Sequence, residues 1–381
     1  MDGQRCALCG CLWWPEVSQL HLGLVGPVPP PNGGMAMQTE QLARLLRAEG
    51  LQVSQVATNA PYWPGFVSRL PGVRAVFRLL PYLVRVWRLV GRVDVIHLMA
   101  NSGWSWQLFA APVLWLAWLR RRPVIVNYRG GEASEYFRRS WRRIHPSLRK
   151  AALVVVPSGY LQAVFADYGQ ATRVIPNIVD QTRFRPVPEP VVESDAFTLV
   201  ITRNLEPIYG IDTALRALAI VLHEAPNTRL RIAGSGPQEG ALKALAEQLG
   251  IAAAVQFEGR LDRAGVVTLY AAADAMLNPT TVDNMPNSVI EALACGVPVI
   301  STDVGGVPFI VRHEHTALLV PANDPDAMAA AMLRILGDGK LRQQLRANGL
   351  NEVAQYGWPE VRHLWLDAYT MAVGAQQGAA T

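Results

Sequence analysis

Residues 279–306, PTTVDNMPNSVIEALACGVPVISTDVGG, contain the chain's most informative group of side chains for chemistry. Asp283 falls in an expected loop, and Glu291 follows eight residues later in the first turn of an expected helix. Such carboxylates can accept hydrogen bonds from sugar hydroxyls, while a helix N-terminus favours phosphate. Together they predict a sugar-nucleotide site. A capping box, with Asn287 or Ser288 as the cap, explains Glu291 almost as well, but it leaves Asp283 unexplained.

Two glycine turns could bring backbone N–H groups close to an anion. Gly33 and Gly34 precede an amphipathic helix, and Gly234 and Gly236 follow a strand in IAGSGPQEG. Neither turn has the lysine of a phosphate-binding P-loop or the GxGxxG spacing. Each turn is therefore either a phosphate contact or simply a tight connection between a strand and a helix.

The elements that must position these residues alternate along the whole chain. Short β-branched runs alternate with longer helical patterns, which predicts parallel sheets covered by helices. The fold class is therefore α/β, with two doubly wound, Rossmann-like lobes facing a cleft. The expected strands are 21–25, 52–58, 93–98, 124–128, 153–156, 173–175, 197–202, 229–233, 255–258, 275–278, 298–301 and 317–320. The expected helices include 37–48, 73–89, 146–151, 212–222, 238–249, 264–273, 288–295, 325–336 and 358–373.

The predicted domain boundary lies in the proline-rich stretch 181–195, QTRFRPVPEPVVESD. We expect an N-terminal extension over 1–19, an acceptor-side lobe over 20–185 and a donor lobe over 186–357. Residues 358–381 would form a helix that returns to the first lobe, followed by a tail.

The charge distribution predicts an anionic partner for the first lobe. Residues 1–190 contain 22 Lys+Arg and 10 Asp+Glu, whereas residues 191–381 contain 13 and 20. The basic amphipathic stretch Val73–Arg92 and the cluster Arg138–Lys150 favour an anionic membrane surface. Nucleic acid is a weaker alternative, because no nucleic-acid-binding motif is present. The apolar run Ser102–Leu119 is a better core helix than a membrane span, since it contains Gln107 and Pro112.

The four cysteines predict no disulfide framework. Cys6, Cys9 and Cys11 crowd into the first eleven residues, and only Cys295 lies elsewhere. A dispensable leader explains the cluster better than a metal site, because no second ligand pair lies nearby.

The order of segments resembles the family-four glycosyltransferases. The resemblance rests on the glycine turn at 33–34, PNIVD, IAGSGP, the acid pair before EALACGVPVIST, and YGW, and it covers roughly residues 20–373. It implies the GT-B fold and transfer of a sugar from a nucleotide donor with retention, without a metal or other cofactor.

The resemblance also implies roles for individual residues. Asp283 would contact the donor sugar and Glu291 the ribose, while Gly33 and Gly34 would close over the phosphates. Ser158 and Asn177 would frame the cleft near the hinge. The remaining donor contacts would come from Gly234, Asn284, Met285, Pro286, Asn287 and Ser288.

Four positions depart from the family pattern. Asp283 stands where the family usually has Glu, and Arg129 where it has His. Asn204 and Tyr209 occupy the positions of the donor-phosphate Arg and Lys. A leaving diphosphate needs positive charge, so Arg203 and Arg129 are the predicted catalytic cations, alongside Asp283.

The sequence therefore predicts a retaining, metal-independent glycosyltransferase of hexosyltransferase type. It would act on a saccharide or lipid-linked acceptor in cell-surface polysaccharide or glycolipid synthesis, in the cytoplasm or at the inner membrane face. The alternatives are a sugar-nucleotide epimerase and a non-catalytic sugar-nucleotide-binding protein of the same fold.

Overall fold

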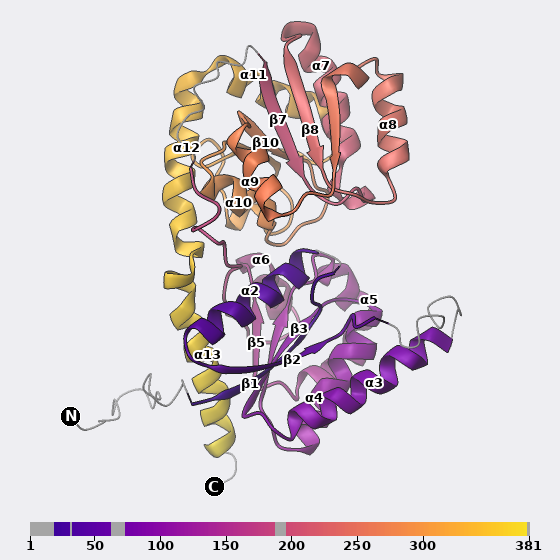
Figure 1. The fold of residues 1–381 in the computed structure, drawn as a ribbon, viewed down its shortest axis with the longest axis vertical. Helices are drawn as coiled ribbons and strands as arrows, with labels where there is room; N and C mark the ends of the chain where they lie inside the picture. The colour runs from indigo at the N-terminus through magenta and orange to yellow at the C-terminus, as the bar shows by residue number, and fades with distance from the viewer. Residues whose placement is uncertain (1–18, 31–32, 62–72, 187–195, 379–381) are drawn as a thin grey trace, which may run out of the picture. The chain divides into compact units, whose positions relative to one another are not determined.

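The computed structural model describes residues 19–30, 33–61, 73–186 and 196–378, which form two compact units. Unit 1 comprises the described residues up to Ile178 and those from Trp358 onward, and unit 2 comprises the described residues of Val179–Gly357. Each unit has one six-stranded sheet in which neighbouring strands run parallel, with helices on both faces (Figure 1). The predicted fold class, two α/β lobes with doubly wound parallel sheets, is confirmed.

The sheet of unit 1 has the strand order β2-β1-β3-β4-β5-β6. Its strands are β1 (His21–Gly26), β2 (Gln52–Ala57), β3 (Val95–Ala100), β4 (Val124–Tyr128), β5 (Leu153–Val156) and β6 (Arg173–Val174). Its helices are α2 (Gly34–Ala48), α3 (Val73–Val90), α4 (Ala111–Leu119), α5 (Ala133–Leu148), α6 (Gly159–Ala166) and α13 (Trp358–Gly378).

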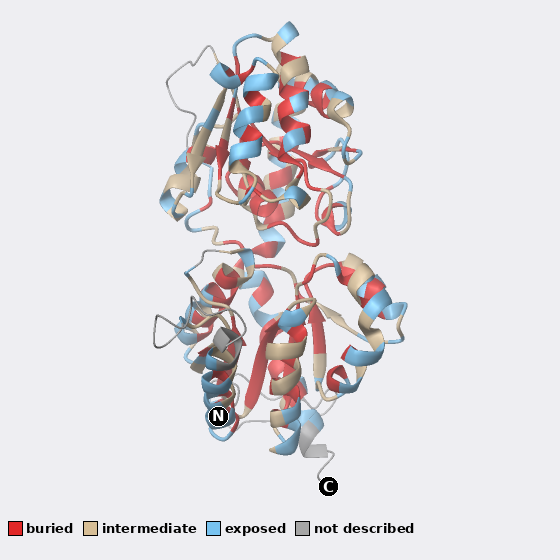
Figure 2. Cartoon of the chain, turned by 90° about the vertical axis from the view of Figure 1, so that its right-hand side faces the viewer, coloured by how far each residue is buried: buried red, intermediate tan, exposed pale blue. Residues whose placement is uncertain are grey.

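Side chains that alternate along the strands build two cores on opposite faces of this sheet. In β3, Ile96 and Leu98 belong to one core, while Val95 and Met99 belong to the other. The second core also takes Trp365 and Tyr369 from α13, so the C-terminal helix is an integral part of unit 1. Every residue of the central strands β3 and β4 is consequently buried, whereas the edge strand β2 is mostly half-buried or exposed. Figure 2 colours the residues by this burial.

The sheet of unit 2 has the strand order β12-β11-β10-β7-β8-β9. Its strands are β7 (Phe197–Thr202), β8 (Thr228–Ala233), β9 (Val255–Gly259), β10 (Ala275–Asn278), β11 (Val299–Thr302) and β12 (Leu318–Val320). Its helices are α7 (Ile211–Glu224), α8 (Glu239–Gln248), α9 (Arg263–Ala271), α10 (Asn287–Ala294), α11 (Pro325–Gly337) and α12 (Gly339–Val353). The strand order reverses between β7 and β10, which is where doubly wound sheets bind ligands.

Two helical segments differ from the sequence prediction. The helix expected at 146–151 is instead α5, which begins at Ala133 and contains Pro146 in its last turn. The run 102–119 forms a short π-helix, Trp106–Ala110, followed by α4. Val113, Leu114 and Ala117 of α4 are buried, so it is a core helix on one side only. Within the described residues, no helix is both long and apolar enough to cross a membrane.

The boundary between the units lies at Ile178/Val179, earlier than the expected 185/186. Residues after 178 belong to unit 2 because the N–H of Val179 donates to Tyr356 O and the ring of Phe184 packs against Tyr270. Cys6, Cys9 and Cys11, and residues 187–195 of the expected linker, lie outside the described residues.

Candidate active site

The predicted donor residues of unit 2 gather where the strand order reverses. Arg203 directly follows β7, and the loop that carries Asp283 follows β10, the neighbouring strand. The carboxyl ends of parallel strands share one edge of a sheet, so two residues eighty positions apart in sequence become neighbours.

Arg203 and Asp283 form an ion pair that is largely shielded from water. Their side chains are 11% and 13% exposed. The guanidinium also lies over the ring of Tyr209, 4.3 Å from its centre, and its buried Nε has no hydrogen-bond partner among the described residues. Burial lowers the pKa of Arg203. The two side chains therefore form a fixed dipole, and the Arg203 Nε–H is a hydrogen-bond donor without a partner among the described residues.

Backbone contacts hold the loop that carries Asp283. The Asp283 carbonyl oxygen accepts from the N–H of Gly306 at 3.0 Å, and Ile208 O accepts from the N–H of Thr281 at 2.8 Å. The Asp283 Oδ1 accepts from the N–H of Asn284 at 2.9 Å. A Cβ at Gly306 would overlap the carbonyl of Asn284. Gly305 and Gly306 thus allow the close approach that fixes Asp283, a role that the sequence analysis missed.

The capping interpretation of Glu291 is wrong. Helix α10 begins at Asn287, and its N-cap residue Pro286 makes no side-chain capping bond. The Ser288 hydroxyl is buried without a hydrogen-bond partner among the described residues, and Glu291 lies in the second turn, not the first. Neither side chain contributes the capping that the sequence pattern suggested.

Glu291 lies in an environment that favours its neutral form. Burial raises its pKa from 4.5 to about 7, and Arg263 and Arg203 offset part of that rise. Behind it, the Tyr270 hydroxyl bonds to Thr202 Oγ1 at 2.6 Å and donates to Ser288 O at 3.0 Å. Tyr270 therefore ties α9 to the end of β7 and to α10. The sequence analysis did not identify it.

The turn after β8 packs tightly against the backbone that follows β7. A Cβ at Gly234 would overlap Arg203 O, and one at Gly236 would overlap Leu205 O. The Gly234 N–H already donates to Gly259 O at 2.8 Å. Among the other predicted donor residues, the Asn204 amide donates to Glu206 at 3.4 Å, and Met285 is buried in the core beside α10.

Unit 1 holds Arg129 in a chain of neutral hydrogen-bonding groups. Its Nε donates to Asn127 Oδ1 at 3.0 Å, and its Nη1 donates to Asn177 Oδ1. Asn127 bonds to His97 at 2.9 Å, and His97 bonds to the Tyr369 hydroxyl at 2.9 Å. Burial lowers the pKa of Arg129 to about 10. Within the described residues Arg129 forms no ion pair, so its positive charge is not neutralised.

The other residues predicted in unit 1 differ in their surroundings. Gly33 is the N-cap residue of α2, Gly34 begins that helix, and a Cβ at Gly33 would meet no atom within 4 Å. Ser158 caps α6 by accepting from the N–H of Leu161 at 3.5 Å. His97 and Asn127 were missed, although a polar residue within the apolar runs VIHLMA and VIVNY is a usable signal.

Comparison with known families gives the same two-part division. The model described as "Glycosyltransferase Family 4" matches residues 32–183, and "Glycosyl transferases group 1" matches residues 187–352. The chain belongs to the family-four glycosyltransferases.

Curated relatives of this chain include D-inositol 3-phosphate glycosyltransferases. That of Jonesia denitrificans is 26% identical over 385 residues, covering 88% of this chain and 90% of the relative. That of Saccharomonospora viridis is 31% identical over 225 residues, 55% of this chain and 52% of the relative. In the latter and in that of Thermobispora bispora, the matched region spans about half of the relative's length.

Solved structures share the GT-B fold with this chain. Sucrose-phosphate synthase from Thermosynechococcus elongatus aligns with a TM-score of 0.75 at 22% identity, covering 95% of this chain and all of that one (100%). Anabaena HepE in complex with UDP aligns with a TM-score of 0.73 at 18% identity, covering 92% and 99%. At these identities the likeness establishes the fold alone.

We predict that Gly306→Ala displaces the Asp283 loop, because the added methyl group meets backbone. Overpacking of this kind costs about 1–3 kcal/mol. Thermal unfolding should show a clear loss of stability, and nucleotide binding should weaken. Gly240→Ala is the matched control, since no atom lies within 4 Å of its Cβ position. Equal stability of the two variants would contradict this role of Gly306.

We predict an acid-sensitive contribution from His97. Burial, followed by the charge of Arg129, lowers its pKa from 6.5 to about 3. Below pH 6.5 the unfolded chain binds a proton that the folded chain does not. The free energy of unfolding should therefore fall by up to about 1.4 kcal/mol per pH unit between pH 6 and pH 4. The free energy of unfolding, measured by denaturant titration at each pH, should depend less steeply on pH in His97→Gln than in the wild type. In the exposed control His363→Gln, its pH dependence should be unchanged.

Proposed function

We propose that this chain transfers a sugar, with retention of configuration, from a nucleoside-diphosphate sugar to a saccharide or lipid-linked acceptor. The observation that carries the proposal is the shielded Arg203–Asp283 pair at the point where the unit 2 strand order reverses. Anabaena HepE has been crystallised in complex with UDP and with UDP-glucose, which makes uridine nucleotides the first donors to test. A role in cell-surface polysaccharide or glycolipid synthesis is part of this proposal.

In this proposal the protein supplies position and charge rather than a nucleophile. Asp283 accepts a hydrogen bond from a donor-sugar hydroxyl, and Arg203 donates to an oxygen of the departing diphosphate. The N-terminus of α10, which begins at Asn287, adds backbone N–H groups and a favourable dipole, and Asn284 and Pro286 lie in the loop before it. The acceptor oxygen then attacks from the side that the phosphate leaves, and the leaving phosphate takes its proton.

Three further assignments belong to the same proposal. Arg129 supplies uncompensated positive charge in unit 1, Gly33–Gly34 approach a phosphate, and Asn204 and Tyr209 shape the donor site around Arg203. The proposal assigns no step to a metal ion or other cofactor.

Incubation with the donor alone distinguishes a glycosyltransferase from an epimerase, which would consume the donor without any acceptor. A binding protein would take up the donor with no transfer across an acceptor panel.

We expect Arg203→Ala to lower kcat by about 100- to 1,000-fold, because a charge-stabilising donor is removed. The variant also leaves Asp283 unpaired, so the double variant Arg203→Ala/Asp283→Asn should be measured beside it to separate folding from chemistry. Arg231→Ala is the matched control, since Arg231 pairs with Glu258 in the same unit. A folded Arg203→Ala enzyme with an unchanged kcat would remove Arg203 from the mechanism.

Glu291 gives the proposal a pH signature. A ribose diol donates hydrogen bonds to the carboxylate form, and the pKa of Glu291 in the free protein is about 7. Donor affinity should therefore rise as the pH increases from 6 to 8, by at most about tenfold per unit below pH 7. Calorimetric titration with an intact nucleotide sugar should show this rise in the wild type and its loss in Glu291→Gln. The same pH dependence in both proteins would contradict the assignment.

A further inference from the structure

Exposed apolar side chains of unit 1 concentrate on two neighbouring helices, α3 and α4. Ten large hydrophobic side chains are exposed in the described part of the chain, and seven of them lie on these two helices. They are Phe77, Leu80, Val84 and Trp87 on α3, and Trp115, Trp118 and Leu119 on α4. Exposed apolar surface gathered on one face marks an interaction site more strongly than scattered residues do.

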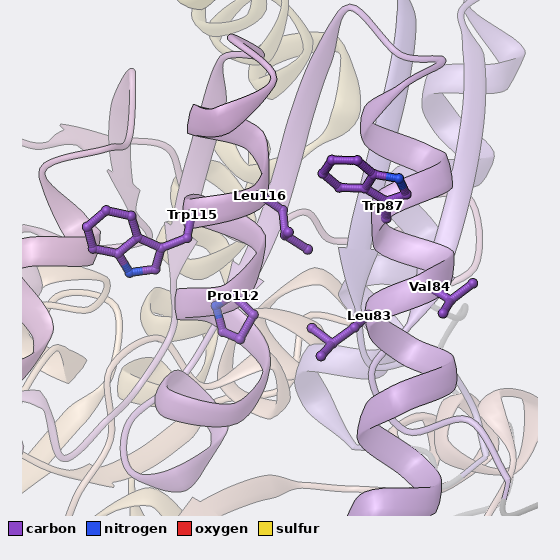
Figure 3. A pocket seen from close by; sticks show the side chains of 6 residues that line it. All are labelled: Leu83, Val84, Trp87, Pro112, Trp115 and Leu116. Carbon is purple, nitrogen blue, oxygen red and sulfur yellow. The ribbon is translucent and has the colours of Figure 1, made fainter.

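The two helices enclose a shallow groove without polar lining. Its walls are Leu83, Val84 and Trp87 of α3 and Pro112, Trp115 and Leu116 of α4. Leu83 and Pro112 face each other across the gap between the helices (Figure 3). We call this surface, with Leu80, Trp118 and Leu119, the α3–α4 face. Trp118 is 53% exposed and Leu119 is 65% exposed, so the face continues beyond the groove.

Positive charge surrounds these apolar residues. From residue 73 to residue 131 the sequence contains nine arginines and a single acidic residue, Asp94. Arg85, Arg88 and Arg92 are exposed, and none of the three forms an ion pair among the described residues. This charge is therefore available to an anionic partner.

Cations also lie directly over the exposed indole rings. Arg120 is 3.5 Å from the centre of the Trp87 ring, and Lys150 is 4.0 Å from that of Trp118. Tryptophan with adjacent Arg or Lys is the combination that occupies the interface between lipid headgroups and acyl chains.

We propose that the α3–α4 face docks on an anionic lipid bilayer. The indoles and leucines enter the headgroup region, and Arg85, Arg88 and Arg92 neutralise lipid phosphates. A protein partner would match an apolar groove, but the unpaired arginines around it favour a surface of dense negative charge. This inference goes beyond the proposed sugar transfer and does not rest on the donor site.

The test is flotation of the full chain with two kinds of vesicles. One is phosphatidylcholine alone, and the other contains about one-third phosphatidylglycerol. We expect binding to the anionic vesicles, weakened at high salt, and at least tenfold weaker binding to the neutral ones, since each basic residue near an anionic surface adds to the binding. Equal binding to both vesicles, or no binding to either, would overturn the proposal.

Paired variants separate the apolar and electrostatic contributions. Trp87→Ser/Trp118→Ser should weaken binding at least tenfold even at low salt, whereas Phe309→Ser, at an exposed residue of unit 2, should have no effect. Arg85→Glu/Arg88→Glu should also weaken it at least tenfold, and Arg216→Glu/Arg229→Glu is the matched control, at two exposed arginines of unit 2.

Two further measurements control for misfolding of the variants and for self-association. Unchanged thermal unfolding and nucleotide binding would show that the variants fold. Sedimentation tests whether the face binds a second copy of the chain. The proposal would be overturned if the wild type is a dimer, Trp87→Ser/Trp118→Ser is a monomer, and that variant still binds vesicles normally.

Discussion

The candidate site of unit 2 depends on one shielded ion pair, Arg203–Asp283. A carboxylate or guanidinium so far removed from water is costly when alone, and pairing offsets the cost only where the geometry is maintained. The structure maintains it without regular secondary structure around Asp283. Gly305 and Gly306 lie against one side of the loop, and Ile208 O accepts from the threonines before it. The geometry of the ion pair is therefore a property of the packed loops as a group.

Unit 1 holds its buried cation by different means. Arg129 is fixed by the amide oxygens of Asn127 and Asn177, and the chain of hydrogen bonds continues through His97 to Tyr369. Neutral amides orient a guanidinium without cancelling its charge. Arg203 is thus part of a neutral pair, whereas Arg129 keeps a net positive charge. The C-terminal helix contributes Tyr369, so segments far apart in the sequence support this arginine.

The surface of unit 1 combines features that folding alone does not explain. A helix that covers a sheet needs one apolar side, and α3 and α4 already bury Tyr82, Val86, Val113 and Leu114. Their second apolar side adds nothing to that core. The arginines beside the exposed tryptophans keep this side compatible with water, and in the proposed docking they bind lipid phosphates. The same residues contribute to the charge asymmetry between the two halves of the sequence.

The sequence by itself determined the parallel α/β architecture, because helix and strand periodicities depend only on neighbours along the chain. It also identified Asp283, Glu291, Arg203 and Arg129 as residues of interest. It missed most of α5, because the many charged residues of that helix obscure the periodicity of its apolar residues. It also misidentified Ser288 as a helix cap. That Arg203 reaches Asp283, or that Tyr369 supports Arg129 through His97, was decided by the tertiary structure alone. Such pairs depend on which parallel strands become neighbours, and the order of strands in a sheet is set by packing between distant segments.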